Sequence, residues 1–424
     1  MQAGFRHFPL CGTEKVLAAH LQCRVRAFVS IPLIAFGGAA SMALAMGIAR
    51  FSYTPILPFM VRDAGLSTEG SGVLATLNFI GYLLASLWPI FARRMGYAPG
   101  PKTTLRWAML AALLTTGAMA LTTSFAAWAV LRFVSGMISV LIMVYATAIV
   151  LDAAARAGSS MGAGVHYSGV GFGIVLSGLM VGQLEALQAG WRGLWLGAAG
   201  LILLLIPLVL MTVTRRTPAG AARPPSASPA PATTTPHHPG WLIAAYALAG
   251  IGFIVSGTYL PLIAKQQPQL AEYAALTWVL LGLASIPSNV FWAWVAARIG
   301  STAALIVQYA LQAVGVVLPV FFATPWALMA SGIIVGGTFM GIVTVATGAA
   351  RNLAPHRTAE MIAIMTAAYS VGQIVGPPLA SQLAARSGNF NQGLIIAGAA
   401  LLLGIVFLLL DAKRASAARI NGNA

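Results

Sequence analysis

Two segments of the chain decide its fold: Gly47–Pro58, GIARFSYTPILP, and Gly250–Pro261, GIGFIVSGTYLP. Both begin with Gly-Ile and end with Leu-Pro, so four residue pairs coincide at a single offset of 203 residues. Each segment lies inside a long apolar run. The match predicts that the chain contains two copies of one helical unit.

Weaker matches extend the repeat beyond these two segments. Offsets of 202 to 204 residues relate Trp88 to Trp292, Arg94 to Arg298, Gly96 to Gly300, Tyr167 to Tyr369 and Ser168 to Ser370. An offset that drifts so little along the chain is hard to obtain by chance, even in a Gly- and Leu-rich sequence. We therefore expect two similar halves.

The composition is that of a membrane protein. Of the 424 residues, 59% are hydrophobic and 8% are charged, whereas soluble domains have about 45–50% apolar and about 25% charged residues. This excludes a soluble enzyme, a disordered chain and, with 2 cysteines, a disulfide scaffold. The net charge of +16 is spread in short clusters between apolar runs, which is typical of membrane-protein loops rather than of nucleic-acid binding.

The apolar runs are continuous rather than alternating, so they predict helices and not a barrel. Each apolar run is long enough to cross a bilayer, which takes roughly 20 residues. We expect about twelve transmembrane helices, near residues 28–58, 69–92, 104–122, 125–150, 161–184, 192–213, 241–263, 273–296, 302–321, 325–349, 360–383 and 393–411.

The segment 214–240 interrupts this pattern. It is rich in Pro, Ala, Ser and Thr and has no apolar periodicity, which is typical of a flexible or partly extended linker. The expected organisation is an N-terminal tail (1–26), a six-helix half (27–213), the linker (214–240), a second six-helix half (241–411) and a C-terminal tail (412–424).

The basic residues predict the orientation. With the N-terminus inside the cell, the outer loops hold only 4 of the 24 Lys and Arg residues, namely Arg62, Arg192, Lys265 and Arg386, and Arg50 and Arg132 fall within apolar runs. The remaining 18 lie in inner loops and tails. This bias follows the positive-inside rule, so both tails and the linker are expected in the cytosol.

Three local motifs resemble those of the major facilitator superfamily. ARRMG at Ala92–Gly96 is similar to its loop motif between helices 2 and 3, RFVSG at Arg132–Gly136 to its helix 4 motif, and GWRGLW at Gly190–Trp195 to the start of its helix 6. More narrowly, GIARFSYTPILP, HYSGVGFGI and AYALAGIGFIVSGTYLP resemble the YbfB/YjiJ-like branch, whose members are bacterial inner-membrane carriers.

The resemblance implies two parallel six-helix halves that rock around a central site. It also implies a secondary active transporter in the bacterial inner membrane. The partners it implies are a small-molecule substrate, the lipid bilayer and a coupling ion or counter-substrate.

The loop motif departs from the superfamily in one place. Its usual Asp is Arg93 here, and the second copy has Ala297. In the superfamily that Asp helps to hold the cytosolic side shut, so another acid must act here. We expect Arg93 and Glu360 to form a charge-reversed gate pair, supported by Asp152 with Arg94.

The sequence shows no chemistry of an enzyme. No metal-ligand cluster, Cys/His pair, nucleophile elbow or nucleotide-binding motif appears, so no cofactor and no metal site are expected. The 8 acidic residues lie in tails, in loops or at helix ends: Glu14, Asp63, Glu69, Asp152, Glu185, Glu272, Glu360 and Asp411. Proton coupling through a carboxylate deep in the membrane is therefore not visible.

Arg50 and Arg132 are the two cations within apolar runs. An Arg that faces lipid costs at least about 2.5–3.5 kcal/mol, so both should face the protein interior or a water-filled cavity. One interpretation is that they attract an anionic substrate, because guanidinium matches carboxylate and phosphate geometry. The alternative for Arg50 is that it caps helix carbonyls or reaches the outer interface. The alternative for Arg132 is a role in helix packing or in a proton relay, and for Arg132 this alternative is favoured.

Other residues complete the candidate site. Polar side chains near helix midpoints, with Asn78 and Gln373 foremost and Tyr369 among them, are candidates for substrate contact, although such groups also join helices in lipid. Tyr53, close to Arg50 in the sequence, is a further candidate. Pro55 and Pro58 remove backbone donors and permit bending, so the first helix is a candidate gating element.

The expected function is alternating-access transport of a small anionic or amphipathic molecule. One alternative is an efflux carrier for apolar or toxic compounds, which the Trp-rich helix with Trp278, Trp292 and Trp294 would suit. Another, of a different class, is a membrane sensor or scaffold that keeps the carrier fold without transport.

Overall fold

The computed structural model describes residues 32–88, 95–96, 100–156, 161–214, 240–353 and 358–422. Within these ranges the chain is helical and forms no strand. The first span runs over residues 32–63 and includes the π-helical segment η1 (Ala43–Ile48) and α2 (Tyr53–Asp63). The other helices of the first half are α3 (Thr68–Ser86), α5 (Pro101–Ala118) with η2 (Met119–Leu121), α6 (Phe125–Arg156), α7 (Met161–Ala186) and α8 (Trp191–Val209) with η3 (Leu210–Thr214).

The second half begins at α9 (Gly240–Lys265), where the second copy of the repeat lies. The short η4 (Ala271–Tyr273) leads into α10 (Ala274–Ile299), and α11 (Ser301–Phe321), α12 (Pro325–Leu353), α13 (Thr358–Ser387) and α14 (Asn391–Gly422) follow. Each half therefore contributes six membrane-length stretches to the described part of the chain, as the sequence predicts.

Local sequence explains several helix boundaries. Ser67 caps α3, because its hydroxyl accepts a hydrogen bond from the Gly70 amide at 3.0 Å. Pro101 begins α5, a position where its missing N–H is not needed. Gly300 ends α10 with φ of 86°, a backbone conformation that favours glycine.

Eleven stretches in the described residues are long and apolar enough to cross a membrane. The twelfth, α3, has 19 residues and carries Glu69 in its first turn, so it is less apolar than the others. Large apolar side chains are exposed on the outer helices, including Leu121, Val130 and Leu204. In a soluble protein such exposure is unusual, but here it suits contact with lipid tails.

The last helix extends well beyond the predicted transmembrane stretch. The predicted tail began at residue 412, but α14 continues to Gly422. Residues 412–422 are AKRASAARING, and Ala, Lys and Arg are strong helix formers. The apolar run therefore ends where expected, while the backbone helix continues past it. The tail 1–26 and linker residues 215–239 lie outside the described part of the chain.

The predicted repeat is visible in the packing. A Cβ built on Gly47 would lie 2.3 Å from the Gly173 Cα atom, and one on Gly372 would lie 3.0 Å from the Gly250 Cα atom. Both contacts join the first helix of a half to its fifth. Since Gly250 is the repeat partner of Gly47, the first and fifth helices of each half approach closely at the same position of the first helix, as small residues permit in membranes.

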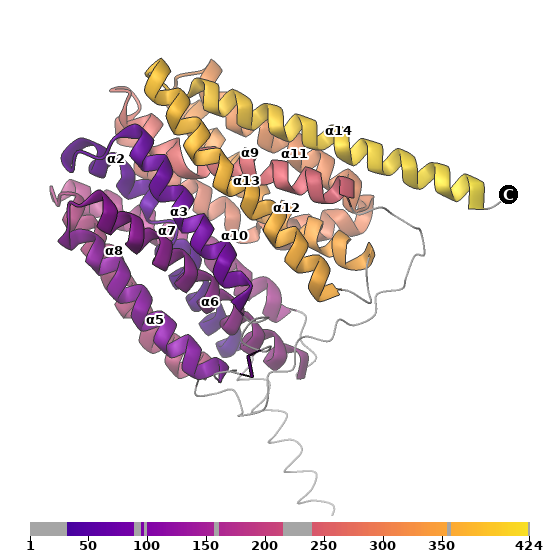
Figure 1. The fold of residues 1–424 in the computed structure, drawn as a ribbon, viewed down its shortest axis with the longest axis horizontal. Coiled ribbons are helices and arrows are strands. Elements are labelled where there is room, and N and C mark those ends of the chain that lie inside the picture. The colour runs from indigo at the N-terminus through magenta and orange to yellow at the C-terminus, as the bar shows by residue number, and fades with distance from the viewer. Residues whose placement is uncertain are drawn as a thin grey trace, which may run out of the picture.

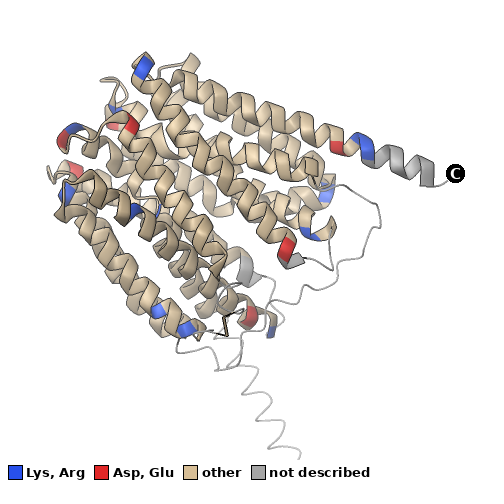
Figure 2. Ribbon diagram, in the orientation of Figure 1, with Lys and Arg blue, Asp and Glu red and all other residues tan. Residues whose placement is uncertain are grey.

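The two halves meet along three helix pairs. α7 packs against α10, α3 packs against α13, and α2 packs against α9 over a smaller area. Figure 1 shows α3 and α13 lying close at the end where α2 terminates and diverging toward the other end. Figure 2 shows that most charged residues lie at the ends of the helices, with an almost uncharged band between them. A band of this kind is expected for the part of a bundle that contacts lipid tails.

Candidate functional site

The first span is irregular at Arg50. The Ala49 and Phe51 amides donate to the Leu44 and Met46 carbonyls, at 2.9 and 3.1 Å, in the five-residue spacing of a π-helix. Residues 49–52 form a turn before α2 begins. Pro55, which follows shortly, has no N–H to continue a regular ladder. Such bulges are frequent at functional sites, and this one lies in the middle of a buried helix.

Arg50 lies at the centre of the molecule, between the halves. Its side chain is 2% exposed. Nη2 donates to Gln373 Oε1 on α13 at 3.2 Å, and Nη1 contacts Met46 Sδ at 3.9 Å. The guanidinium carbon lies 4.0 Å from the Tyr82 ring centroid and 4.6 Å from that of Phe79, both on α3. Two helices of one half and one of the other therefore enclose this cation.

Arg132 supports the turn that carries Arg50. It is 3% exposed, and its Nη1 donates to the Arg50 carbonyl at 3.4 Å. Its guanidinium carbon lies 4.4 Å from the Tyr53 ring centroid. The Asn78 amide donates in turn to the Arg132 carbonyl at 2.9 Å. Arg132 and Asn78 thus hold helices together, which is the structural role considered for Arg132. Both residues also lie beside Arg50.

Ser135 makes a similar link, and we expect Ser135→Ala to lower the stability of the protein by about 0.6 kcal/mol. Its hydroxyl donates to the Ala49 carbonyl at 3.1 Å, which joins α6 to the turn at Arg50. Thermal unfolding in detergent measures the effect. Ser139→Ala is the matched control, because the Ser139 hydroxyl bonds only to Gly136 within its own helix. Equal effects of the two substitutions would contradict the inter-helix role.

The remaining candidate binding residues lie on both sides of Arg50. The buried Tyr53 hydroxyl donates to the Ser71 carbonyl at 2.9 Å. Tyr369 lies one turn before Gln373 on α13, is partly exposed, and stacks on Tyr246 with ring centroids 4.6 Å apart. The structure therefore brings Arg50, Arg132, Asn78 and Gln373 together, with Tyr53 under Arg132 and Tyr369 beside Gln373.

A small cavity lies on the α2 side of Arg50. It is lined by Arg50, Phe51, Tyr53, Thr54, Ala75, Phe79, Arg132, Ile254, Gly257 and Thr258, and it has room for about one water-sized molecule. Thr54 closes one wall by donating to the Gly257 carbonyl at 2.7 Å. Thr54 and Gly257 are repeat partners at the offset of 203, so the two halves meet here at equivalent positions.

The candidate gating residues are only partly placed. Pro55 and Pro58 are buried in α2, and Pro58 lies inside the helix. Arg93 and Arg94 lie outside the described residues, so neither predicted gate pair is tested. Asp152 forms an ion pair with Arg156, one turn later on α6, and Glu360 is exposed in the first turn of α13.

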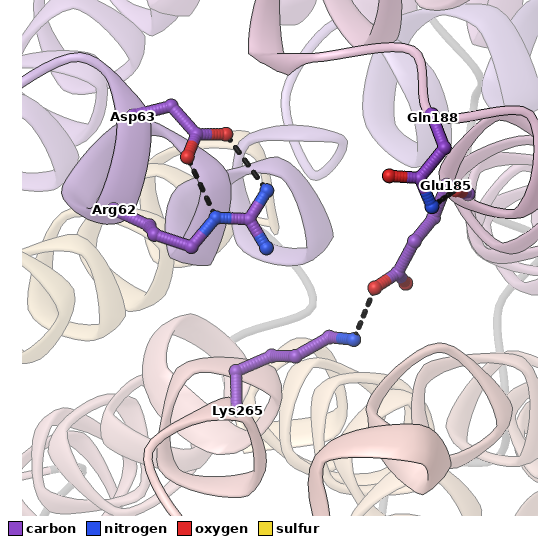
Figure 3. A network of polar contacts seen from close by, with 5 residues as sticks. All are labelled: Arg62, Asp63, Glu185, Gln188 and Lys265. Atoms are coloured by element: carbon purple, nitrogen blue, oxygen red, sulfur yellow. Dashed lines mark hydrogen bonds and ion pairs between the residues drawn. The ribbon is translucent and has the colours of Figure 1, made fainter.

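An ion pair that the sequence analysis did not predict joins the halves near the end of α2. Glu185 on α7 pairs with Lys265 on α9, while Arg62 and Asp63 pair with each other nearby (Figure 3). The Lys265 ammonium lies 5.6 Å from the Phe59 ring centroid. The sequence analysis placed Glu185 and Lys265 in loops or at helix ends. No local sequence pattern predicts that two residues 80 positions apart form an ion pair.

The architecture defines a class of protein. Two repeated six-helix halves with an enclosed polar centre are the architecture of major facilitator carriers. No group of three or more His, Cys, Asp or Glu residues that could hold a metal occurs in the described ranges.

The family model described as "Uncharacterised MFS-type transporter YbfB" matches residues 42–409, and the chain belongs to this family. It is a multi-pass membrane transporter and not an enzyme.

Solved structures with this fold include the nucleoside transporter NupG. A point mutant of NupG aligns with a TM-score of 0.67 at 13% sequence identity, covering 91% of this chain and 99% of that one. NupG without that mutation aligns with a TM-score of 0.65, at the same identity and coverage. At this identity the likeness shows the fold alone. A search of curated protein sequences gave no significant match.

Proposed function

We propose that this protein is a secondary active transporter that moves a small anionic molecule by alternating access, with Arg50 at the centre of the binding site. The observation that carries the proposal is the position of Arg50: a permanent cation, 2% exposed, between the halves and bonded to Gln373 of the opposite half. A ligand at this point would touch both halves at once, as alternating access requires.

The charge of Arg50 supports an anionic ligand. In the described part of the chain no carboxylate contacts Arg50 or Arg132, since the ion pairs found there lie at helix ends. The neighbours of Arg50 are an amide, a thioether and aromatic rings. These groups stabilise a cation but do not neutralise it. A carboxylate or phosphate would add the charge complement that the protein lacks here.

The polar contacts between the halves suggest how transport is coupled to binding. Thr54–Gly257, Thr76–Ile374 and Glu185–Lys265 all lie on the α2 side of Arg50. On the orientation that the charge bias predicts, this is the outer side. The structure then corresponds to a carrier closed to the outside, and a ligand that displaces Gln373 from Arg50 would change the balance between the closed and open states.

Export of apolar compounds is less well supported. That alternative relied on Trp278, Trp292 and Trp294. The Trp278 indole N–H donates to Ser177 Oγ at 3.1 Å, and that of Trp292 donates to the Gly337 carbonyl at 2.7 Å. Both rings are buried in helix contacts, whereas Trp294 is exposed and lies under Arg298. These tryptophans join helices and anchor the surface of the bundle.

Transport by the purified protein tests the proposal. Proteoliposomes would be loaded with small carboxylates, phosphate esters, neutral analogues or cationic amines, and uptake and exchange would be measured with and without imposed ion gradients. We expect saturable transport of an anion and none of its neutral analogue. Transport of neutral apolar compounds instead would favour efflux. A carrier that transports nothing, yet changes its stability with a ligand, would favour a sensor or scaffold.

The proposed location is the bacterial inner membrane, with both termini and residues 214–240 in the cytoplasm. We expect a cysteine placed in this linker, in a variant with Cys11 and Cys23 replaced by Ser, to resist an impermeant thiol reagent in intact cells. It should react after the cells are opened. A cysteine at exposed Gln188, between α7 and α8, is the matched outer control. The orientation is wrong if the linker cysteine reacts from outside.

The cytosolic gate remains part of the proposal. Arg93 with Glu360, supported by Asp152 with Arg94, would replace the acid that the loop motif lacks. Asp152 already has Arg156 as a partner, so Arg94 would have to share or replace that contact. Exchanging the charges of Arg93 and Glu360 tests the main pair: the double variant should recover transport that each single reversal loses.

A further inference from the structure

The cavity beside Arg50 is lined by two guanidinium groups. Arg50 and Arg132 both border it, and they are 2% and 3% exposed. Arg132 Nη1 lies 3.4 Å from the Arg50 carbonyl oxygen, and both side chains border the same small cavity. In an apolar environment two like charges repel strongly, and burying them without a counter-charge is costly.

Both guanidinium groups also have an unused donor. The Nε–H of Arg50 and the Nε–H of Arg132 are buried and lack a hydrogen-bond partner. Buried donors in native proteins are almost always satisfied. The terminal nitrogens of Arg50 contact Gln373 and Met46, which leaves its Nε–H for a ligand on another edge of the group.

The rest of the wall suits an anion. Thr258 is 3% exposed and also lines the cavity. The carbonyl of Gly257 accepts from Thr54, and that of Arg50 accepts from Arg132, so both oxygens are already engaged by donors. Phe51, Phe79, Ala75 and Ile254 form the apolar remainder. In such surroundings the attraction between an anion and two cations is only weakly screened.

We propose that this cavity is a binding site for a small inorganic anion of halide size. The space is at the lower limit for one water molecule, so a monatomic anion such as chloride enters only if the surrounding side chains move outward slightly, and an organic carboxylate does not fit. A halide would accept from the two Nε–H donors and offset one of the two positive charges, which leaves a net charge of +1 beside the proposed organic-anion position. The site is distinct from the proposed organic-substrate position at the Gln373 edge of Arg50, and its existence does not require that the protein transport an organic anion.

Thermal unfolding of the purified full-length protein in detergent tests the site. Chloride, bromide and gluconate would be titrated at constant ionic strength and constant cation. We expect a saturable rise in Tm with chloride and with bromide and no saturable rise with gluconate, because an anion that binds only the folded state stabilises it. The absence of a halide-specific rise in the native protein would overturn the proposal.

Variants then locate the site. Arg132→Gln should abolish the halide-dependent rise, and Thr258→Val, which keeps the shape but removes a hydroxyl, should raise the half-saturating chloride concentration several-fold. Arg298→Gln is the matched control, because Arg298 is exposed and lies over Trp294, far from the cavity lining. If Arg132→Gln does not fold, the halide response of Thr258→Val alone tests whether the halide binds in this cavity. A rise that persists unchanged in Arg132→Gln or in Thr258→Val would place the halide elsewhere and refute the site.

These results are separable from the test of transport. A halide effect with no transport of organic anions would contradict the proposed function and leave the cavity site standing. Transport of an organic anion with no halide effect would support the proposed function and refute the halide site in the cavity. A halide effect that is present in the native protein and lost in the cavity variants would also make chloride a candidate coupling ion, to be examined by reversing the chloride gradient in proteoliposomes.

Discussion

Arg50→Gln is expected to abolish transport of the anionic substrate while the protein still folds and inserts. Glutamine retains a polar group for Gln373 and removes the charge. Removing one partner of a buried charged hydrogen bond costs about 2–5 kcal/mol, which corresponds to a loss of at least roughly 30-fold in kcat/KM for transport. Uptake normalised to the amount of protein in the membrane measures the loss.

Arg50→Lys separates charge from geometry. Lysine keeps the positive charge but lacks the planar fork that binds carboxylate or phosphate through two parallel hydrogen bonds. It also loses part of the stacking on Tyr82 and Phe79. We expect Arg50→Lys to fold and to lose most of the transport activity, while Arg386→Gln, at an exposed helix end, leaves transport unchanged.

A purely structural Arg50 would give a different pattern. Arg50→Lys would then be nearly silent, or Arg50→Gln would be poorly expressed for want of the contacts with Gln373 and Met46. Undiminished transport by Arg50→Gln would remove Arg50 from the binding site, and the proposal of an anionic substrate would fail with it.

The sequence predicted the fold because membrane helices and internal repeats leave local signals. Apolar runs long enough to cross a bilayer predicted the helices. The pairs Gly47 with Gly250 and Pro58 with Pro261 predicted the two similar halves. The structure places those glycines at equivalent close contacts. Burial of Arg50 and Arg132 also followed from the sequence, since the cost of a cation in lipid directs it toward the protein interior.

The partners of these residues did not follow, because they depend on tertiary packing. Tyr82 and Phe79 enclose Arg50 from a different helix, and Gln373 reaches it from the other half. The π-helical turns before Arg50 are also invisible in sequence, because Pro55 indicates a possible bend but not which hydrogen bonds are rearranged. Lys265 was used for the orientation alone and Glu185 was given no partner, so the pairing of these two residues was missed.

That pairing supports the second prediction: Glu185→Lys is expected to shift the carrier toward the state that is open on the α2 side. The native pair joins the last turn of α7 to the last turn of α9, and the side chains are 31% and 18% exposed. Partly exposed pairs contribute about 0–1 kcal/mol. Two opposed lysines replace that attraction with repulsion of similar size, a change of up to about 2 kcal/mol, so the open population should rise by up to roughly 30-fold.

Accessibility of a cavity residue measures the shift. Ala75 lines the cavity beside Arg50, is 2% exposed, and lies on α3. In a variant with Cys11 and Cys23 replaced by Ser, Ala75→Cys should react slowly with an impermeant thiol reagent added outside. Adding Glu185→Lys should accelerate the reaction, and adding Lys265→Glu as well should return the rate close to its starting value, because the double exchange restores an ion pair across the halves.

Asp63→Asn is the matched control for this experiment. It breaks the nearby Arg62–Asp63 pair, whose members are adjacent in α2 and belong to one half. The loss of a contact within one half does not favour either conformation, so the rate at Ala75→Cys should stay unchanged. If Asp63→Asn accelerates labelling as much as Glu185→Lys, the general loss of charge at this end of the bundle is responsible. If the double exchange labels as fast as Glu185→Lys alone, the contact between Glu185 and Lys265 does not hold the halves together.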